Sequence, residues 1–259
     1  MTRVTVPDIL ELKRSKQKIV CLTAYDDFGA RMVDQSGAEI LLVGDSLGSV
    51  IQGSANTTGV SLADVAYHVR CVRTGVRRAL IVADLPMGSY GSSVAQAVDS
   101  SVQLVRAGAC AVKIEGTYCD EIRAIIKAGI PVMGHLGLTP QSVHVFGGHK
   151  VQGRSGPDKL IEQALQIQEA GVFGIVLELV TSSSAKSVSE ELKVPTIGIG
   201  SGPHCDGQVQ VLHDVLGMGV RQFKHAKVYV DCKSLVSQAL QSYVSEVKSG
   251  EFPGEDNSF

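Results

Sequence analysis

Short apolar runs alternate along this chain with segments in which apolar residues recur every three or four positions. The runs are rich in Val, Ile and Leu and occupy residues 19–24, 39–43, 79–83, 111–115, 130–134, 173–178, 194–199 and 208–212. They are too continuously apolar for strands with one face in water. We therefore predict parallel strands that are covered on both sides.

The segments between these runs have the spacing of helices. Several begin with Ser or Pro, as helix starts do, and clear examples are 61–76, 92–107 and 157–170. Eight strands alternating with helices predict an α/β fold, a (β/α)8 TIM barrel, although a doubly wound open sheet would give the same local pattern. We prefer the barrel, as one domain over residues 1–259, because a single barrel commonly needs this length.

Four of the apolar runs deliver an acidic residue at or near their ends. Asp45 follows "ILLVG", and Asp84, Glu115 and Glu178 close "LIVAD", "AVKIE" and "GIVLE". Any one of them could be a helix cap or a solvated loop residue. In both parallel architectures, however, ligands bind at the carboxyl ends of the strands. Four acids at such ends together predict one active site.

Carboxylates gathered at one rim repel one another, and a hard cation relieves that repulsion. Oxygen ligands suit Mg²⁺, which typically takes one or two carboxylates and leaves other positions to water and substrate. Asp45 and Asp84 fit that pattern. Lys113 lies two residues before Glu115, so both side chains point to the same face of their strand. Lys113 could hold an anionic substrate group there, and a structural Lys–Glu pair is the alternative.

The charge balance excludes several classes of partner. The chain carries 24 basic and 26 acidic residues, so it offers no field to hold a nucleic acid or an anionic membrane. Charge interrupts the N-terminal segment, no run reaches membrane-spanning length, and the six cysteines are scattered. We expect a cytoplasmic protein with reduced thiols and a small-molecule partner.

Three further features leave alternatives open. The stretch 134–156 is long for a connection in a compact domain and is either a lid over the site or a surface loop. "GIGSG" at 198–202 lacks the third glycine of a dinucleotide-binding motif and is typical of a tight turn. His135 also closes an apolar run, and we leave it unassigned between a structural and a catalytic role.

Seven segments, in matching order over nearly the whole chain, resemble the ketopantoate hydroxymethyltransferase family. They are "LTAYD" (22–26), "LLVGDSLG" (41–48), "ADLPMGSY" (83–90), "VKIEG" (112–116), "GHLGLTPQS" (134–142), "FGGHKVQGR" (146–154) and "IGIGSGPHCDGQVQVLHDVLG" (197–217). The resemblance implies a barrel of the phosphoenolpyruvate/pyruvate type and a large homo-oligomer such as a decamer. It also implies formation of 2-dehydropantoate from 3-methyl-2-oxobutanoate and 5,10-methylenetetrahydrofolate, the committed step towards pantothenate and coenzyme A.

The same resemblance implies a role for each of the residues found at strand ends. Asp45 and Asp84 would bind Mg²⁺ and the substrate, with Glu115 supporting the metal directly or through water. Ser46 and Lys113 would hold the oxoacid, and Glu178 would be the base. The chemistry fits, because a proton next to a ketone is weakly acidic and the enolate formed by its removal needs electrostatic stabilisation, which Mg²⁺ can supply.

The chain departs from the family pattern at several positions, all outside the proposed catalytic residues. They are Leu179 and Thr181 after the base, Thr58 and Gly59 in "NTTGVSL", Met87, and Asn257 in the tail. Two other functions stay open: a folate-independent, Mg²⁺-dependent oxoacid lyase or aldolase on the same barrel, and a catalytically silent barrel. An assay with and without the folate donor separates the first from the hydroxymethyltransferase, and the intact acids argue against the second.

Overall fold

The computed structural model describes residues 2–219 and 222–259 of the chain. The chain divides into two compact units, Met1–Val211 and Leu212–Phe259. All of the strands that the structure describes lie in the first unit. One barrel domain over residues 1–259 stays a prediction.

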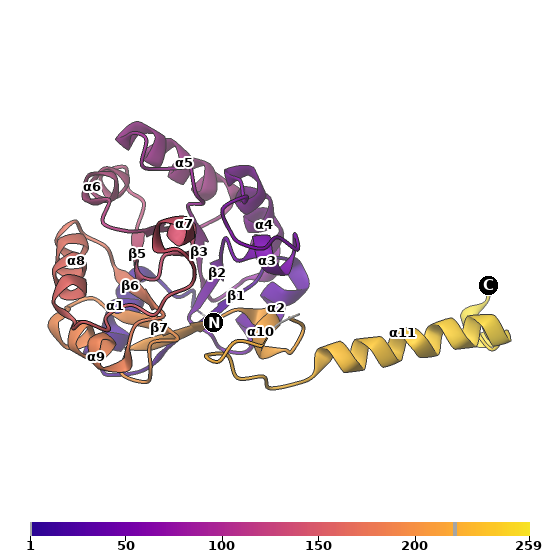
Figure 1. Cartoon of the computed structure of the whole chain (residues 1–259). Coiled ribbons are helices and arrows are strands. Elements are labelled where there is room, and N and C mark those ends of the chain that lie inside the picture. Colours follow the sequence, from indigo (N-terminus) through magenta and orange to yellow (C-terminus); the bar gives the residue numbers. More distant parts are fainter. Residues whose placement is uncertain (1, 220–221) are drawn as a thin grey trace. The chain divides into compact units, whose positions relative to one another are not determined.

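The first unit is built on eight parallel strands that close into a barrel in chain order (Figure 1). The strands are β1 Ile19–Thr23, β2 Ile40–Val43, β3 Leu80–Asp84, β4 Ala111–Glu115, β5 Val132–Gly137, β6 Gly174–Glu178, β7 Thr196–Ile199 and β8 Gly207–Gln210. Cys21 of β1 lies opposite both Ile40 of β2 and Val209 of β8. The predicted barrel is therefore confirmed, because in a doubly wound sheet the first and last strands would not pair in this way.

Helices surround the strands, as Figure 1 shows. In the first unit they are α1 Val6–Arg14, α2 Asp27–Gln35, α3 Leu47–Val50, α4 Leu62–Gly75, α5 Val94–Ala107, α6 Cys119–Lys127, η1 Pro140–Ser142, α7 Val143–Phe146, α8 Asp158–Glu169 and α9 Ser182–Glu191. Ser61 caps α4 in a reciprocal exchange with Asp64, and the Ser93 side chain accepts from the Gln96 amide at the start of α5. The helices predicted at 61–76, 92–107 and 157–170 are confirmed to within two residues.

Strand β5 runs further than the apolar run that predicts it. The run ends at Gly134, whereas the strand continues to Gly137, which lies opposite Glu178 of β6. A Cβ on Gly137 would stand 2.3 Å from the Glu178 carbonyl oxygen, and its φ of +93° is one that glycine adopts readily. The extension places His135 inside the strand and brings β5 close to the end of β6.

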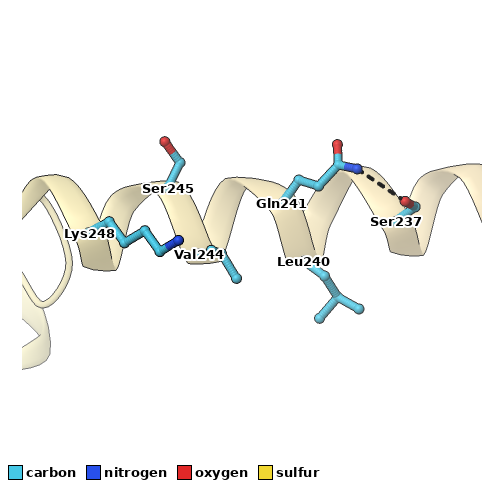
Figure 2. Close-up of a pocket in the computed structure, with 6 residues that line it drawn as sticks. All are labelled: Ser237, Leu240, Gln241, Val244, Ser245 and Lys248. Carbon is cyan, nitrogen blue, oxygen red and sulfur yellow. Dashed lines mark hydrogen bonds between the residues drawn. The ribbon is translucent and has the colours of Figure 1, made fainter.

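The second unit contains α10 Leu212–Val215, α11 Cys232–Ser249 and η2 Glu255–Asn257. Apolar residues recur along α11 at helical spacing and are exposed in the described structure: Leu235, Val236, Leu240, Tyr243, Val244 and Val247. We call these six residues the α11 stripe. Figure 2 shows Leu240 and Val244 on one side of the helix and Gln241 and Ser245 on another. Over the described residues, no helix is both long and apolar enough to cross a membrane.

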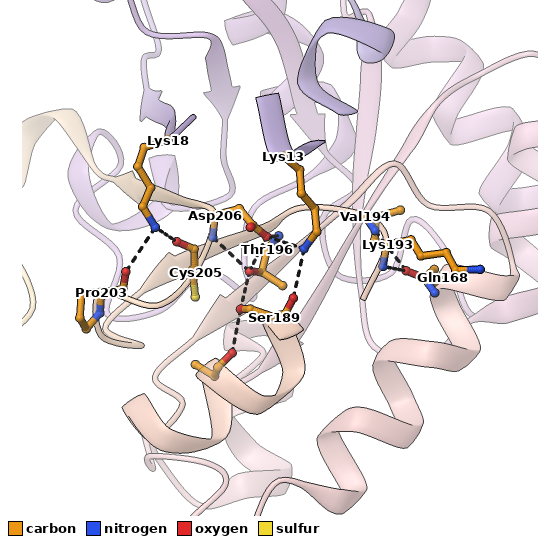
Figure 3. Close-up of polar contacts among 11 residues, drawn as sticks. Lys13, Lys18, Gln168, Ser189, Lys193, Val194, Thr196, Pro203, Cys205 and Asp206 are labelled. Atoms are coloured by element: carbon orange, nitrogen blue, oxygen red, sulfur yellow. Dashed lines mark hydrogen bonds and ion pairs between the residues drawn. The ribbon is translucent and has the colours of Figure 1, made fainter. Parts of the chain in front are cut away.

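A polar network ties α1 to the start of the last two strands (Figure 3). Asp206 accepts hydrogen bonds from Lys13 Nζ at 2.8 Å and from the Thr196 amide at 2.8 Å. Lys13 also donates to the Ser189 carbonyl. Ile9 of α1 is fully buried in the barrel core. Helix α1 thus packs at the amino ends of the strands, where contacts serve stability, and the polar site lies at the other end of the barrel.

Candidate active site

The four acids predicted at strand ends lie at the carboxyl end of the barrel. Asp84, Glu115 and Glu178 are the last residues of β3, β4 and β6, and Asp45 follows β2 by two residues. Asp45, Asp84 and Glu115 are at most 5% exposed, whereas the Glu178 side chain is 20% exposed. Carboxylates buried to this degree need partners, and those partners define the site.

Asp45 and Asp84 meet through a backbone hydrogen bond. The Asp45 amide donates to Asp84 Oδ2 at 2.9 Å. This approach depends on Gly44, because a Cβ there would lie 2.8 Å from Ser46 Oγ and 3.4 Å from Asp84 Oδ2. The glycine that precedes the acid in "VGDS" therefore lets the β2 and β3 strand ends come together.

Lys113 lies inside the barrel mouth and pairs with Asp84. Its Nζ is 2.8 Å from Asp84 Oδ1, and the side chain is almost completely buried. Burial alone would lower the pKa of Lys113, but Asp84, Glu115 and Asp45 raise it above the ordinary lysine value. Lys113 is therefore a fixed positive charge at neutral pH, and its ion-pair partner is Asp84 on the neighbouring strand.

His135 lies between two of the acids and the lysine. Its Nδ1 is 3.3 Å from Glu115 Oε1 and 3.1 Å from Lys113 Nζ, and its Nε2 is 3.4 Å from Glu178 Oε2. Burial and Lys113 act to lower the pKa of His135, but Glu115 and Glu178 raise it to about 9. The residue left unassigned from the sequence thus connects Glu178 to the rest of the site.

Two further side chains at the site belong to segments that the sequence highlighted, but neither was predicted. The Tyr25 hydroxyl, in "LTAYD", lies 2.8 Å from the half-buried Ser46 hydroxyl. Gln141, in "GHLGLTPQS", donates through Nε2 to Asp45 Oδ2 at 2.9 Å. Both are uncharged, so a search for acids at strand ends could not find them.

The backbone around Glu178 is unusual. Leu179 has a φ of +46°, a left-handed conformation that costs a non-glycine residue about 1 kcal/mol. Ser201, in the "GIGSG" segment, fixes the same place: its hydroxyl donates to the Leu177 carbonyl and accepts from the Val180 amide. The strand end that carries Glu178 is therefore held on both sides of the turn.

The long stretch 134–156 also contacts this turn. It forms the end of β5, then η1 and α7, and its far part makes a bridge between Gln152 and Val180. The Gln152 amide donates to the Leu179 carbonyl at 2.8 Å. Gln152 thus anchors the stretch next to the turn after Glu178, and Gln141 anchors it beside Asp45. A lid function stays a prediction.

The donor set at the mouth suits a hard divalent cation held partly by other ligands. Burial, and then the nearby Asp84 and Glu115 carboxylates, raise the pKa of Asp45 to about 8. A cation would relieve that repulsion. Across the described residues, no three His, Cys, Asp or Glu side chains form a ready metal cage. The carboxylate oxygens of Asp45 and Asp84 suit Mg²⁺, which takes one or two carboxylates together with substrate and water.

A family model and full-length relatives of this chain all carry the name of one family of enzymes. The ketopantoate hydroxymethyltransferase family model matches residues 3–255. The 3-methyl-2-oxobutanoate hydroxymethyltransferase of Ignicoccus hospitalis is 48% identical over 98% of both chains, and that of Caldicellulosiruptor saccharolyticus is 49% identical over the full length of both.

Solved structures of similar fold are more distant in sequence. Phosphonopyruvate hydrolase in complex with oxalate and Mg²⁺ has a TM-score of 0.65 at 12% identity and covers 99% of this chain and 93% of its own. 2,3-Dimethylmalate lyase, of the PEP mutase/isocitrate lyase superfamily, has a TM-score of 0.63 at 17% identity, with 100% and 92% covered. These structures show the same barrel fold.

Proposed function

Because the chain belongs to the ketopantoate hydroxymethyltransferase family, we propose that it transfers a hydroxymethyl group to 3-methyl-2-oxobutanoate and forms 2-dehydropantoate. One observation carries the proposal to the level of residues. The five charged residues at the strand ends join into one cluster through contacts of 3.4 Å or less, with His135 as the link: Asp45, Asp84, Lys113, Glu115 and Glu178.

Lys113 and Ser46 bind the oxoacid in this proposal. The substrate is an anion, and Lys113 offers a buried positive charge already oriented by Asp84. The Ser46 hydroxyl, paired with the Tyr25 hydroxyl, can donate to a substrate oxygen. Together they hold the substrate carboxylate and keto group so that C3 faces β6.

Asp45 and Asp84 would hold Mg²⁺, with Glu115 supporting it directly or through water. When bound, the cation withdraws electron density from the keto group and so makes the C3 proton more acidic. The repulsion between the buried Asp45 and Asp84 carboxylates supports this assignment.

Glu178 is the base. It takes the proton from C3, and His135 Nε2, 3.4 Å from Glu178 Oε2, keeps the carboxylate oriented. The carbanion carbon of the substrate then forms a bond to the one-carbon unit of 5,10-methylenetetrahydrofolate. Both C–N bonds of the methylene bridge break and water supplies the hydroxyl oxygen. The two nitrogens of the departing tetrahydrofolate take up the proton held by Glu178 and the remaining proton of the water. The positive charge of Lys113 offsets the negative charge that develops on the substrate.

The test is Glu178→Gln, which keeps the shape of the side chain but cannot take a proton. The variant should bind the oxoacid in the presence of Mg²⁺ yet lose product formation and the exchange of the C3 proton with D₂O. The exchange needs no folate donor, so it isolates proton removal from carbon–carbon bond formation. Glu190→Gln, on the exposed face of α9, is the matched control. Exchange at the wild-type rate in Glu178→Gln would make another group the base, with His135 the next candidate.

The proposal also includes a cytoplasmic location and a homo-oligomeric assembly. All six cysteines are free, which supports a reducing compartment such as the cytoplasm. The exposed α11 stripe supports a homo-oligomer, with the decamer of the family as the expected form.

Turnover measured with and without the folate donor tests the co-substrate directly.

A further inference from the structure

We propose that Gln141 is a positioning residue that sets the Asp45 and Glu115 carboxylates for the cation and the oxoacid. This inference rests on the proposed function above, because it concerns how the same site is held in its working geometry. Gln141 does not contact the reacting atoms in this proposal. It acts through the two acids.

Gln141 contacts both acids by different groups. Its side-chain Nε2 donates to Asp45 Oδ2 at 2.9 Å, and its backbone amide donates to Glu115 Oε2 at 3.1 Å. The residue itself is 8% exposed. One residue of η1, on the connection after β5, therefore fixes one oxygen of the acid after β2 and one oxygen of the acid on β4.

The orientation of the Gln141 amide is determined by its neighbours. Nε2 also donates to the Leu85 carbonyl at 3.0 Å, while Oε1 accepts from the Tyr90 hydroxyl at 2.7 Å. A flipped amide would place Oε1 against the Leu85 carbonyl, which cannot donate. The Tyr90 ring packs edge-on against the Tyr118 ring, with 5.1 Å between the ring centroids. The network thus holds the amide N–H on Asp45.

The chemical consequence is a fixed direction for the Asp45 carboxylate. The hydrogen bond engages Oδ2, and the carboxylate held in this direction would be one of the ligands of the cation. Carboxylates that bind metals generally depend on such a partner, and loss of the partner costs about 10- to 100-fold in metal affinity. A neutral amide is suited to this place because it donates without adding charge beside three buried acids.

The experiment measures Mg²⁺-dependent binding of 3-methyl-2-oxobutanoate by calorimetry and the melting temperature of each variant. Gln141→Leu removes the donor, and Gln141→Glu keeps the volume but replaces the donor with an acceptor. Each should weaken Mg²⁺-dependent binding at least tenfold. A loss in Gln141→Glu equal to or larger than that in Gln141→Leu shows that filling the volume is not enough and that a neutral donor is needed at this position.

Gln168→Leu is the matched control. In the wild-type protein, Gln168 Oε1 accepts from the Lys193 and Val194 amides near the amino end of β7, as Figure 3 shows. This variant also loses a glutamine with two backbone hydrogen bonds. It should lower the melting temperature and leave Mg²⁺-dependent binding of the oxoacid unchanged.

Tyr90→Phe keeps the test decisive if Gln141→Leu does not fold. It removes the hydroxyl that holds the Gln141 amide and should weaken Mg²⁺-dependent binding about threefold. Where the double variant folds, Tyr90→Phe should add little to Gln141→Leu, because both act through the same contact.

The outcomes separate this inference from the proposed function. A wild-type protein that shows no Mg²⁺-dependent binding of the oxoacid contradicts the proposed function. A wild-type protein that binds, together with Gln141→Leu and Tyr90→Phe variants of the same affinity, overturns the positioning role alone. Variants of Gln141 and Tyr90 with a lower melting temperature but wild-type affinity would also overturn the positioning role.

Discussion

Asp84 has both carboxylate oxygens in contact with other site residues, Oδ1 with Lys113 and Oδ2 with the Asp45 amide. Asp84→Ala removes both contacts and one of the two proposed metal ligands. We expect Mg²⁺-dependent oxoacid binding to fall at least tenfold. Titration of the oxoacid with and without EDTA measures this. Equal affinity of the variant and the wild type in Mg²⁺ would remove Asp84 from the metal site.

Lys113→Met should impair both stability and function. Removing one partner of a buried pair leaves the Asp84 charge uncompensated and costs about 3–5 kcal/mol. If Lys113 also holds the substrate, oxoacid affinity and turnover fall together.

The double variant Asp84→Asn/Lys113→Met separates the two roles of Lys113. It removes both charges of the pair, so the melting temperature should recover relative to Lys113→Met while oxoacid binding stays weak. Full recovery of binding in the double variant would mean that the lysine serves only to neutralise the acid.

The strand-end acids were predictable because the end of each apolar run shows where its strand stops. In a parallel barrel the carboxyl ends of all strands lie on the same face, so the acids at those ends come together. Gln141 and Tyr25 were not predictable, because neutral polar residues are common in loops and only their partners give them meaning. Lys113 is buried among these acids, but its ion-pair partner Asp84 lies on another strand, and a contact across strands depends on register.

At the scale of elements, the strands were predictable from continuous apolar runs, and the long helices from apolar residues that recur every three or four positions. Strand β5 was the exception, since Gly134, His135 and Gly137 interrupt the apolar pattern while the backbone ladder continues to Gly137. The short helices α3 and α7 have four residues each, too few to show a helical period.

The network at the amino ends of the strands gives a prediction for α1. Asp206→Ala removes the acceptor shared by Lys13 and Thr196, whose contacts are largely shielded from solvent. We expect a loss of about 2–4 kcal/mol, which lowers the melting temperature by roughly 5–15 °C in a chain of this size. The KM for the oxoacid should not change, because the site lies at the opposite end of the barrel.

Asp120→Ala is the comparison for Asp206→Ala. It breaks an exposed ion pair with Arg123 and should change stability by no more than about 1 kcal/mol. Thermal melting of the two variants side by side checks the difference. Equal shifts would show that the Asp206 network contributes no more than a surface pair.

At the scale of the whole molecule, the α11 stripe leaves six apolar side chains of one helix exposed, and we predict that a second copy of the chain covers it. Leu240→Glu/Val244→Glu should reduce the mass measured by light scattering. Gln241→Glu/Ser245→Glu adds the same charge on the polar side seen in Figure 2 and should leave the mass unchanged. An unchanged mass with a lower melting temperature in the first variant would mean that the stripe is covered within its own chain.

The pairing of β1 with β8 bears on the order in which the protein is made. Ile19 is opposite Gly207, so the barrel can close only after nearly four-fifths of the chain has left the ribosome. Until then β1 and β7 each present an open edge, which invites pairing with other nascent chains. Asp45, Asp84 and Glu115 are synthesised early but gain their shared environment late. A chain stalled before residue 207 should therefore depend on chaperones and contain no assembled site.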